Sequence, residues 1–555
     1  MTDAPQAAMT ASGQARSEMT WPSGLFAQVL LALGFIALAF LVRWPSLLYS
    51  VIDWDESLYI LIADALAERG ALPYTEIWDR KPVGIFLIFA GVIKAGFDPI
   101  LGVRLLASVV VGLNAWLLFD LGQRLLRDAR SGLIAGLAYV LMTTTSGGLA
   151  ANTELFFAFF ALHGLVLALR AIAPWQDQPY AGQPVLLALA GLMLGCGLIV
   201  KYSLIFDAAA FVLGWFILTT PSLGRLPQHL LRSLPSLLVM AIALVIPTLL
   251  AMAWYLSAGA LDAYLFANFH AYTEFFGESK PLINPALILT GIANHFPLWL
   301  GAAAAVLAAP WLIRDQHDGR ALAFLLVWLA CTVLSVIFLR HYYWHYFLQI
   351  LPPLALLTGF ALSRGLLARL SGFWPQTALV IALAALALIG VARETYLHGL
   401  LLTKERLTDG DPLAGDIPRQ IARDLATELA VGDSVYVYDQ HPIIYHLLDV
   451  PPPTRLPFFL HIKEEGAYGL TDPHAEIERI IAARPAFIIS KAGVLEGDAA
   501  RSHPINAVVA EAVAQDYTIW RSYPDHRLRH IHRFARLDVG NTDAIVYRLQ
   551  DAGGG

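Results

Sequence analysis

The sequence predicts a mainly α-helical, polytopic membrane protein that ends in a small α/β domain. Of its 555 residues, 57% are hydrophobic and only 14% are charged, and the mean hydropathy is +0.60, so lipid is predicted to solvate most of the chain. Apolar runs long enough to cross a hydrocarbon core of about 30 Å recur between residues 25 and 392. Beyond residue 392, charged residues occur throughout, which is typical of a soluble domain.

The first elements are a tail and a retained membrane span. Residues 1–20 are polar and are predicted to form a disordered cytoplasmic tail. The apolar run Leu25–Val42 is long for a signal-peptide core and has no convincing small-residue cleavage site after it, so we expect it to be a span. Within a transmembrane domain over residues 21–392 there are about eleven spans, because further runs begin near Gly102, Gly132, Thr153, Val185, Leu204, Leu234, Ile292, Ala321, Tyr346 and Thr377.

The apolar segment Val83–Phe97 decides the orientation of every later span. It has only about fifteen residues and is interrupted by Gly91 and Lys94, which favours an interfacial or re-entrant helix in the first outer loop. With this helix outside, the arginine-rich loops are cytoplasmic, as the positive-inside rule requires. They carry Arg124, Arg127, Arg130, Arg170, Arg225, Arg232, Arg314, Arg320, Arg364 and Arg369. The opening loop, the loop 257–294 and all residues after 392 then lie outside, whereas counting the segment as a span reverses the orientation.

Residues 393–555 are predicted to form one soluble extracytoplasmic α/β domain. SVYVY (434–438) and AFIIS (486–490) are predicted as buried strands, while RQIARDLATELA and HAEIERIIAAR have the apolar spacing of helices. Alternating strands and helices indicate a small α/β layer, and about 160 residues suit one domain.

Composition argues against several classes of function. The net charge is −6 and the basic residues are scattered in short loops, which gives no electrostatic footprint for nucleic acid. The two cysteines, Cys196 and Cys331, lie in apolar runs, so no disulfide framework or thiolate metal site is expected. A glycine-rich phosphate loop is absent from the sequence. Asp55, Glu56 and the histidines are metal-ligating residue types without a metal-site spacing, so a divalent cation stays open as an alternative.

The loop after the first span carries unusual charge for a membrane boundary. Acids occur in DWDE (Asp53, Asp55, Glu56) and cations in DRKP (Arg80, Lys81). Carboxylates near hydrocarbon usually face a wet cavity or a partner, although a solvated loop is the simpler interpretation. Acids and cations on one membrane surface suit a reaction in which an acceptor loses a proton and a leaving group gains negative charge. Arg80 is expected to matter less than Lys81 if it merely faces water.

Three further outward-facing positions fit the same picture. Glu154 follows Asn152 where a span emerges, and a helix cap by Asn152 explains this position about as well. Lys201 interrupts two apolar runs, which snorkelling explains equally. In LRHYYWHYF an aromatic belt accounts for the tyrosines and the tryptophan. It does not account for Arg340, His341 and His345, which we interpret as functional.

Four motifs resemble those of the GT-C membrane glycosyltransferases: DWDESLYILIAD, DRKPVG followed by GVRLLAS, GLIVKYSLIF, and HYFLQILPPLALLTG. The similarity covers roughly residues 25–392 and is greatest to the bacterial branch related to protein O-mannosyltransferases and to the aminoarabinose transferase that modifies lipid A. It implies a GT-C-type helical domain and inverting transfer from a polyprenyl-phosphate sugar to a hydroxyl of a lipid, glycan or protein acceptor. The implied site is a cavity at the outer face of the bacterial inner (cytoplasmic) membrane, and no cofactor is required.

The resemblance also implies roles for particular residues. Asp55 is implied as the general base, with Glu56 supporting it or binding an ion. Lys81 matches the lysine that meets the donor phosphate, and Arg104 follows where the family often has an arginine, although Val83 replaces the family's second proline. The remaining cations, Lys201 and Arg340, are further candidates for phosphate binding, and the substrate-binding candidates are Asp53, Tyr59, Glu154, His341 and His345.

Two other classes of function stay open from the residues alone. Ionisable residues in membranes also mark the path of a transporter or flippase for a lipid-linked or anionic substrate. Against this class, the acids gather at one surface and no inverted repeat is detected. The other class is a membrane-anchored binding or assembly protein that acts through its C-terminal domain.

Overall fold

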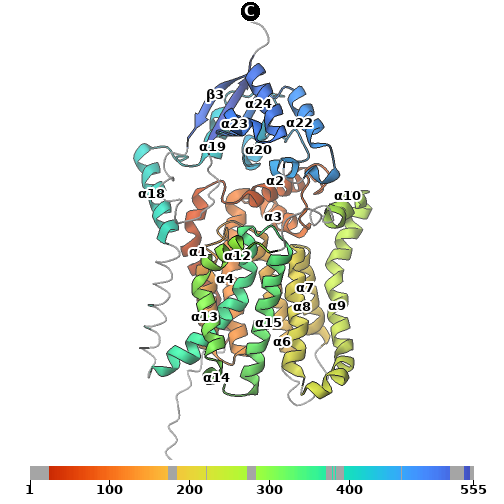
Figure 1. The fold of residues 1–555 in the computed structure, drawn as a ribbon, viewed down its shortest axis with the longest axis vertical. Coiled ribbons are helices and arrows are strands. Elements are labelled where there is room, and N and C mark those ends of the chain that lie inside the picture. Colours follow the sequence, from red (N-terminus) through yellow and green to blue (C-terminus); the bar gives the residue numbers. More distant parts are fainter. Residues whose placement is uncertain are drawn as a thin grey trace, which may run out of the picture.

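A computed structural model describes residues 24–172, 184–220, 222–271, 283–370, 393–463, 466–524 and 543–550, and the single residues 375, 378 and 382. Figure 1 shows a helical bundle with a smaller, sheet-containing domain at one end. The predicted tail, residues 1–20, lies outside the described residues.

Seven helical segments within the described ranges are long and apolar enough to cross a membrane, and one bent pair would make eight. The seven are α1 (Leu25–Arg43) with η1 (Trp44–Leu48), α4 (Pro99–Leu125), α6 (Thr153–Ile172), η3 (Tyr202–Leu204) with α8 (Ile205–Thr219), α9 (Leu226–Ser257), α15 (Gln316–Phe338), and η6 (Trp344–Ile350) with α16 (Leu351–Ala361), η7 (Leu362–Leu366) and η8 (Leu367–Arg369). The bent pair is α12 (Pro285–Asn294) and α13 (Phe296–Leu307), which meet at 89°.

The mainly helical, polytopic fold is confirmed, but these segments are fewer than the eleven spans expected. Two expected spans form the shorter apolar helices α5 (Ala129–Met142) and α7 (Pro184–Leu198), and the one expected near Thr377 lies outside the described residues. The short α5 packs closely on α4, because a Cβ on Gly122 would lie only 2.3 Å from the Cα of Gly132. Glycine at this crossing therefore lets the two backbones meet.

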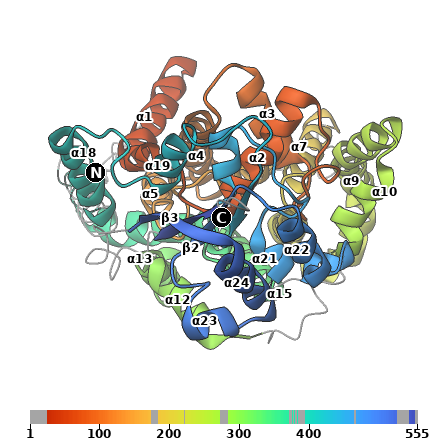
Figure 2. The ribbon, with the colours of Figure 1, turned by 90° about the horizontal axis from the view of Figure 1, so that it is seen from above.

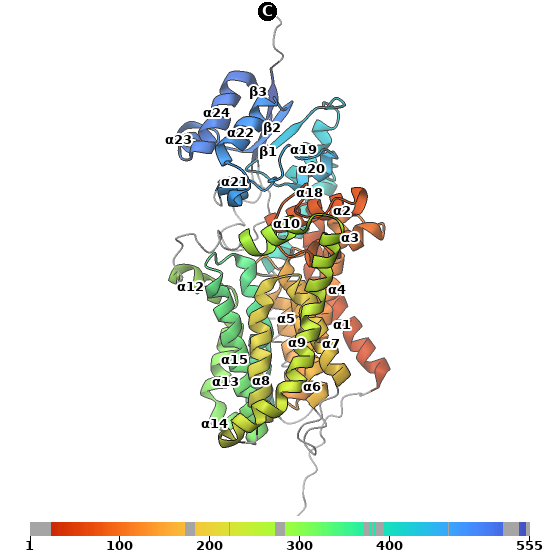
Figure 3. The same cartoon turned by 90° about the vertical axis from the view of Figure 1, so that its right-hand side faces the viewer.

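A layer of short helices lies between the bundle and the smaller domain (Figure 3). It contains α2 (Trp54–Arg69), α3 (Gly84–Lys94), α10 (Leu261–Leu265) and η5 (Phe266–His270). The helix α3 is the short helix expected within residues 83–97, and it is too short to cross a membrane. At the end of the bundle far from this layer lie η4 (Leu223–Arg225) and α14 (Ala309–Leu312).

The C-terminal domain has a four-stranded sheet of order β1-β2-β4-β3. Its strands are β1 (Val435–Tyr438), β2 (Phe487–Lys491), β3 (Tyr517–Tyr523) and β4 (Ala544–Leu549). The pair β1 and β2 is parallel, with Val435 opposite Phe487, and the other two pairs are antiparallel. The two buried strands expected from the sequence are β1 and β2, whereas β3 and β4 were not expected.

Among the described residues, seven α-helices and one short 3-10 turn surround or precede this sheet. They are α18 (Arg393–Asp409), α19 (Ile417–Leu425), α20 (Ile443–Leu448), α21 (Phe459–Lys463), η10 (Gly466–Gly469), α22 (Pro473–Ala482), α23 (Gly497–Arg501) and α24 (Pro504–Asp516). Seen from above, the domain lies over the ends of the bundle helices (Figure 2). Trp54, the first residue of α2, packs on the ring of His441 with centroids 4.0 Å apart, so the domain rests directly on the charged opening loop.

Candidate active site beneath the C-terminal domain

The first turn of α2 places its acids by capping. The Asp53 side chain accepts a hydrogen bond from the Asp55 amide at 3.0 Å, as an N-cap residue does. A second Asp53 oxygen accepts from the Asn152 amide group at 3.2 Å, which ties α2 to the start of α6. Because residues four apart lie on the same face of a helix, Asp55 and Tyr59 point in the same direction.

Asp55 is the centre of a compact polar cluster. Its Oδ2 atom accepts hydrogen bonds from Lys81 Nζ at 2.8 Å and from the Tyr59 hydroxyl at 2.9 Å, and His345 Nε2 lies 3.5 Å away. The side chains of Asp55 and Lys81 are only 16% and 7% exposed. Burial alone raises the pKa of Asp55, but the charges of Lys81 and His345 and the two hydrogen bonds outweigh it and hold that pKa well below its usual range. Asp55 is therefore an ionised carboxylate.

A second ion pair lies beside the first. Lys201 pairs with Glu154, both buried, and its Nζ lies 4.1 Å from the ring centroid of Tyr346. Gly84 brings the two lysines into one site, since its amide donates to the Ile199 carbonyl at 2.7 Å. A Cβ on Gly84 would lie 2.6 Å from that same oxygen, so glycine is required for this approach.

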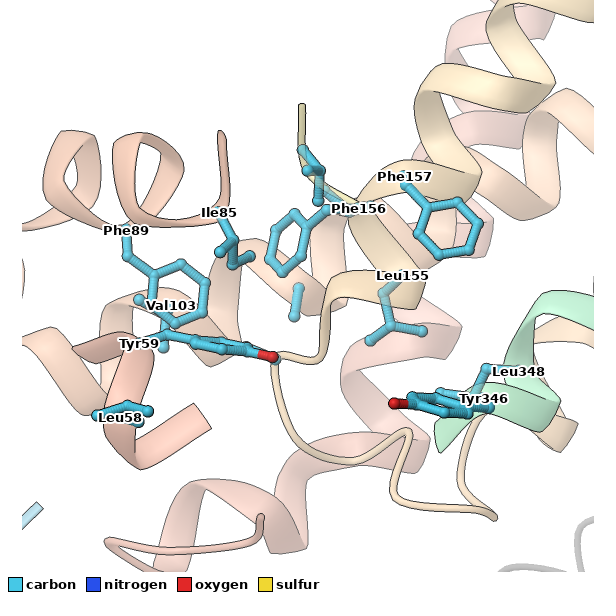
Figure 4. Packing of buried hydrophobic residues seen from close by; sticks show 14 of the residues in the cluster. Leu58, Tyr59, Ile85, Phe89, Val103, Leu155, Phe156, Phe157, Tyr346 and Leu348 are labelled. Atoms are coloured by element: carbon cyan, nitrogen blue, oxygen red, sulfur yellow. The ribbon is translucent and has the colours of Figure 1, made fainter. Parts of the chain in front are cut away.

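Aromatic and aliphatic side chains enclose the polar cluster. In Figure 4 the hydroxyl oxygens of Tyr59 and Tyr346 point toward each other from α2 and η6. Behind Tyr59, the rings of Phe86 and Phe89 pack edge-on at 6.0 and 6.1 Å. The surroundings of low polarity strengthen the interactions between the charges of the site.

The structure brings together most, but not all, of the expected site residues. It gathers Asp53, Asp55, Tyr59, Lys81, Glu154, Lys201 and His345. Two other candidates, Arg340 and His341, lie in the turn before η6, where Arg340 and Tyr342 have positive φ of 58° and 50°. There, the His341 Nδ1 atom lies 2.9 Å from the Leu339 carbonyl, a contact within its own turn.

Within the described residues, Arg104 and Glu56 pair with each other and not with Asp55 or Lys81. Arg104 is fully buried and directs its guanidinium to Glu56, at 3.0 Å from Nε, and to the carbonyl of Ser46 at 2.7 Å. Glu56 is 1% exposed and also accepts from the Ala151 amide at 2.8 Å. Their polar atoms hold the opening turn against α4 and α6.

Sequence reasoning did not predict the buried contacts of Arg80 and Tyr346. Arg80, which was expected to matter little if it faced water, is only 6% exposed and donates a hydrogen bond to the Tyr468 hydroxyl of the C-terminal domain. Tyr346 was assigned to an aromatic belt, yet its ring is buried against Lys201. The signal in the sequence that could have pointed to Tyr346 is its position directly after His345 in the same motif.

A metal ion does not fit this cluster. Across the described ranges, no group of three or more His, Cys, Asp or Glu side chains is arranged to hold one. The Oδ2 atom of Asp55 already accepts from Lys81 and Tyr59, so a cation would have to displace an ammonium group.

Comparisons with known proteins find a matching family and similar sequences. Residues 80–254 match the family described as dolichyl-phosphate-mannose-protein mannosyltransferase. The chain is 28% identical over 367 residues to the undecaprenyl phosphate-alpha-4-amino-4-deoxy-L-arabinose arabinosyl transferase of Pseudomonas paraeruginosa, with 62% of each chain covered. The chain therefore spans less than two thirds of that relative's length.

Solved structures with a similar fold extend the likeness to nearly the whole chain. ArnT from Cupriavidus metallidurans superposes with a TM-score of 0.55 at 17% identity, covering 94% of this chain and 98% of that one. The oligosaccharyltransferase AglB from Archaeoglobus fulgidus, bound to an inhibitory peptide and a dolichol-phosphate, gives 0.50 at 13% identity, covering 90% and 73%. The resemblance in the sequence is thus confirmed: residues 80–254 match the mannosyltransferase family, and the chain as a whole has a fold similar to that of ArnT.

Proposed function

We propose that the protein is an inverting glycosyltransferase that moves a sugar from a polyprenyl-phosphate donor to a hydroxyl of an acceptor at the membrane surface. The observation that carries the proposal is the buried contact of an ionised carboxylate, Asp55, with a lysine, Lys81, at 2.8 Å. One group can accept a proton and the other can bind a phosphate. The name of the Pseudomonas relative supports undecaprenyl phosphate as the lipid carrier and 4-amino-4-deoxy-L-arabinose as the sugar.

The reaction is a single displacement at the anomeric carbon. The acceptor oxygen forms a bond to that carbon as the bond to the phosphate oxygen breaks, which inverts the configuration. Asp55 takes the proton of the acceptor hydroxyl, and Lys81 stabilises the negative charge that develops on the departing phosphate. Ionisation of Asp55 is favoured by its partners, so the base is in the required form at neutral pH.

The other candidate residues, both those in the cluster and those in the turn before η6, take supporting roles in this proposal. Lys201, held by Glu154 and Tyr346, and Arg340 supply further positive charge for the phosphate. Asp53, Tyr59, Glu154, His341 and His345 orient the sugar and the acceptor. No step in this mechanism uses a metal ion, because the arrangement around Asp55 does not suit one.

We further propose a location and a topology. The protein lies in the bacterial inner membrane with eleven spans within residues 21–392 and with residues 393–555 outside the cytoplasm. The distribution of arginines supports this orientation. Arg314 follows α14, which Figure 3 places at the end of the bundle opposite the C-terminal domain.

Transfer by the purified protein tests this function. The protein in lipid nanodiscs is given a radiolabelled undecaprenyl-phosphate sugar and lipid A, and both labelled product and released undecaprenyl phosphate are measured. The proposal expects both products in equal amounts from the wild type and neither from Asp55→Asn. Movement of the labelled donor across a vesicle membrane without product would instead identify a flippase.

A further inference from the structure

The loop that carries Lys81 is bonded to the C-terminal domain through Arg455. The Trp78 amide donates to the Arg455 carbonyl at 2.8 Å, and Arg455 Nη2 donates to the Tyr74 carbonyl at 2.7 Å. The Tyr74 hydroxyl in turn donates to the Lys81 carbonyl at 2.7 Å. Arg455 therefore holds two points of the loop, and one more hydrogen bond connects it to the backbone of the lysine.

Tyr468 of the same domain holds the loop at a second place. Arg80, the residue before Lys81, donates to the Tyr468 hydroxyl, and the Trp78 ring lies 4.7 Å from the Tyr468 ring. Tyr468 and its neighbour Ala467 have positive φ of 51° and 54°. Non-glycine residues adopt this region at a conformational cost and persist there where the surroundings determine them, often at functional sites. The turn is thus held in the shape that meets Trp78 and Arg80.

Residues 70–83 between α2 and α3 form no regular helix or strand, so their own backbone hydrogen bonds do little to fix Lys81. Misplacement of a binding group by about 1 Å can cost a large factor in rate. We propose that the C-terminal domain positions the phosphate-binding lysine: Arg455 and Tyr468 hold residues 74–81 so that Lys81 stays at the donor phosphate. This inference rests on the proposed role of Lys81, and it makes Arg455 and Tyr468 positioning residues.

The test measures binding of a short-chain polyprenyl phosphate to the full-length protein in nanodiscs. Arg455→Ala removes the bond to Tyr74, and Tyr468→Phe keeps the ring but removes the hydroxyl that meets Arg80. Each variant is expected to raise the Kd about tenfold, the scale of a coupling between residues in one network. Matched controls in the same domain are Arg484→Ala, whose exposed partner is Asp516, and Tyr517→Phe, whose hydroxyl bonds the Pro485 carbonyl. These controls are expected to leave the Kd unchanged.

A double-mutant cycle separates positioning from general destabilisation. If Arg455 acts through Lys81, Arg455→Ala has no further effect on the Kd in a Lys81→Ala protein. Two outcomes would overturn this inference alone. One is an equal loss of affinity on Arg455→Ala in the wild-type and the Lys81→Ala backgrounds. The other is an unchanged Kd for Arg455→Ala and Tyr468→Phe while Lys81→Ala binds more weakly. An unchanged Kd for Lys81→Ala would overturn the proposed phosphate site as well. Thermal unfolding of each variant shows whether it is folded. If Arg455→Ala is not folded, the inference is judged on the conservative variant Tyr468→Phe.

Discussion

At the scale of single residues, the charge of Asp55 depends on the groups around one of its oxygen atoms, Oδ2. The Lys81 ammonium and the Tyr59 hydroxyl both donate to Oδ2, and they favour the ionised form more than burial opposes it. Replacing Asp55 by Asn removes the base, so transfer should fall by about 10² or more, the scale of general-base catalysis. Glu68→Gln, an exposed acid-to-amide change on the same helix, should transfer normally.

The lowered pKa of Asp55 also predicts the pH dependence. Protonation of Asp55 requires a pH below the usual carboxyl value of about 4, so the wild-type rate should not fall through this group between about pH 7 and pH 5. Because the folded state lowers the pKa of Asp55, the stability that its ion pair contributes is present above the usual carboxyl pKa and is lost in stronger acid. Initial rates across this range check the expectation. It would be contradicted by a fall in the wild-type rate on acidification that has its midpoint above about pH 5 and is absent from the Asp55→Asn enzyme.

Lys81 and Arg80 are neighbours with different partners. Lys81 faces Asp55, whereas Arg80 is buried against Tyr468. Because Lys81 meets charge that develops only as the donor bond breaks, Lys81→Ala should lower kcat by about 10², as for one pre-organised electrostatic contact. Lys94→Ala, an exposed lysine on α3, is the matched control. Normal turnover by Lys81→Ala at equal membrane levels would move the phosphate role to Lys201.

At the scale of elements, Arg104 and Glu56 join three segments of the bundle. Arg104 of α4 binds the turn η1 through Ser46, and Glu56 of α2 binds the start of α6 through Ala151. Removing one partner of a buried pair leaves an uncompensated charge, so Arg104→Ala should lower the free energy of unfolding by about 3–5 kcal/mol. Arg69→Ala breaks an exposed pair with Glu76 and should cost at most about 1 kcal/mol. Thermal unfolding in detergent compares the two; equal stabilities would refute a structural role for Arg104.

At the scale of the whole molecule, the orientation in the membrane follows from charge. If the arginine-bearing end of the bundle faces the cytoplasm, a reporter that is active only there should be silent when fused after Arg393. The same reporter inserted in the loop at Arg127, between α4 and α5, should be active. The reverse pattern would overturn the topology and would place the polar cluster on the cytoplasmic side.

Sequence patterns alone predict the class of molecule and the neighbourhood of the site. Apolar runs of spanning length predict the helical bundle, since lipid leaves few alternatives to a helix. Local patterns also predicted β1 and β2, whose residues are almost all buried, but missed β3, where most side chains are partly or fully exposed. The same motifs placed Asp55, Lys81, Lys201 and His345 at one surface.

The sequence does not reveal which of the neighbouring charges share a site, because that depends on how the helices pack in three dimensions. Successive residues of a helix point about 100° apart, so Asp55 faces Lys81 while the adjacent Glu56 faces Arg104 inside the bundle. The sequence does not state which of these directions is a cavity and which is a packing interface. Arg80 shows the same limit, because its partner Tyr468 lies 388 residues further along the chain and comes from a different domain. Contacts at such separations depend on how whole elements pack, and local sequence patterns do not record that packing.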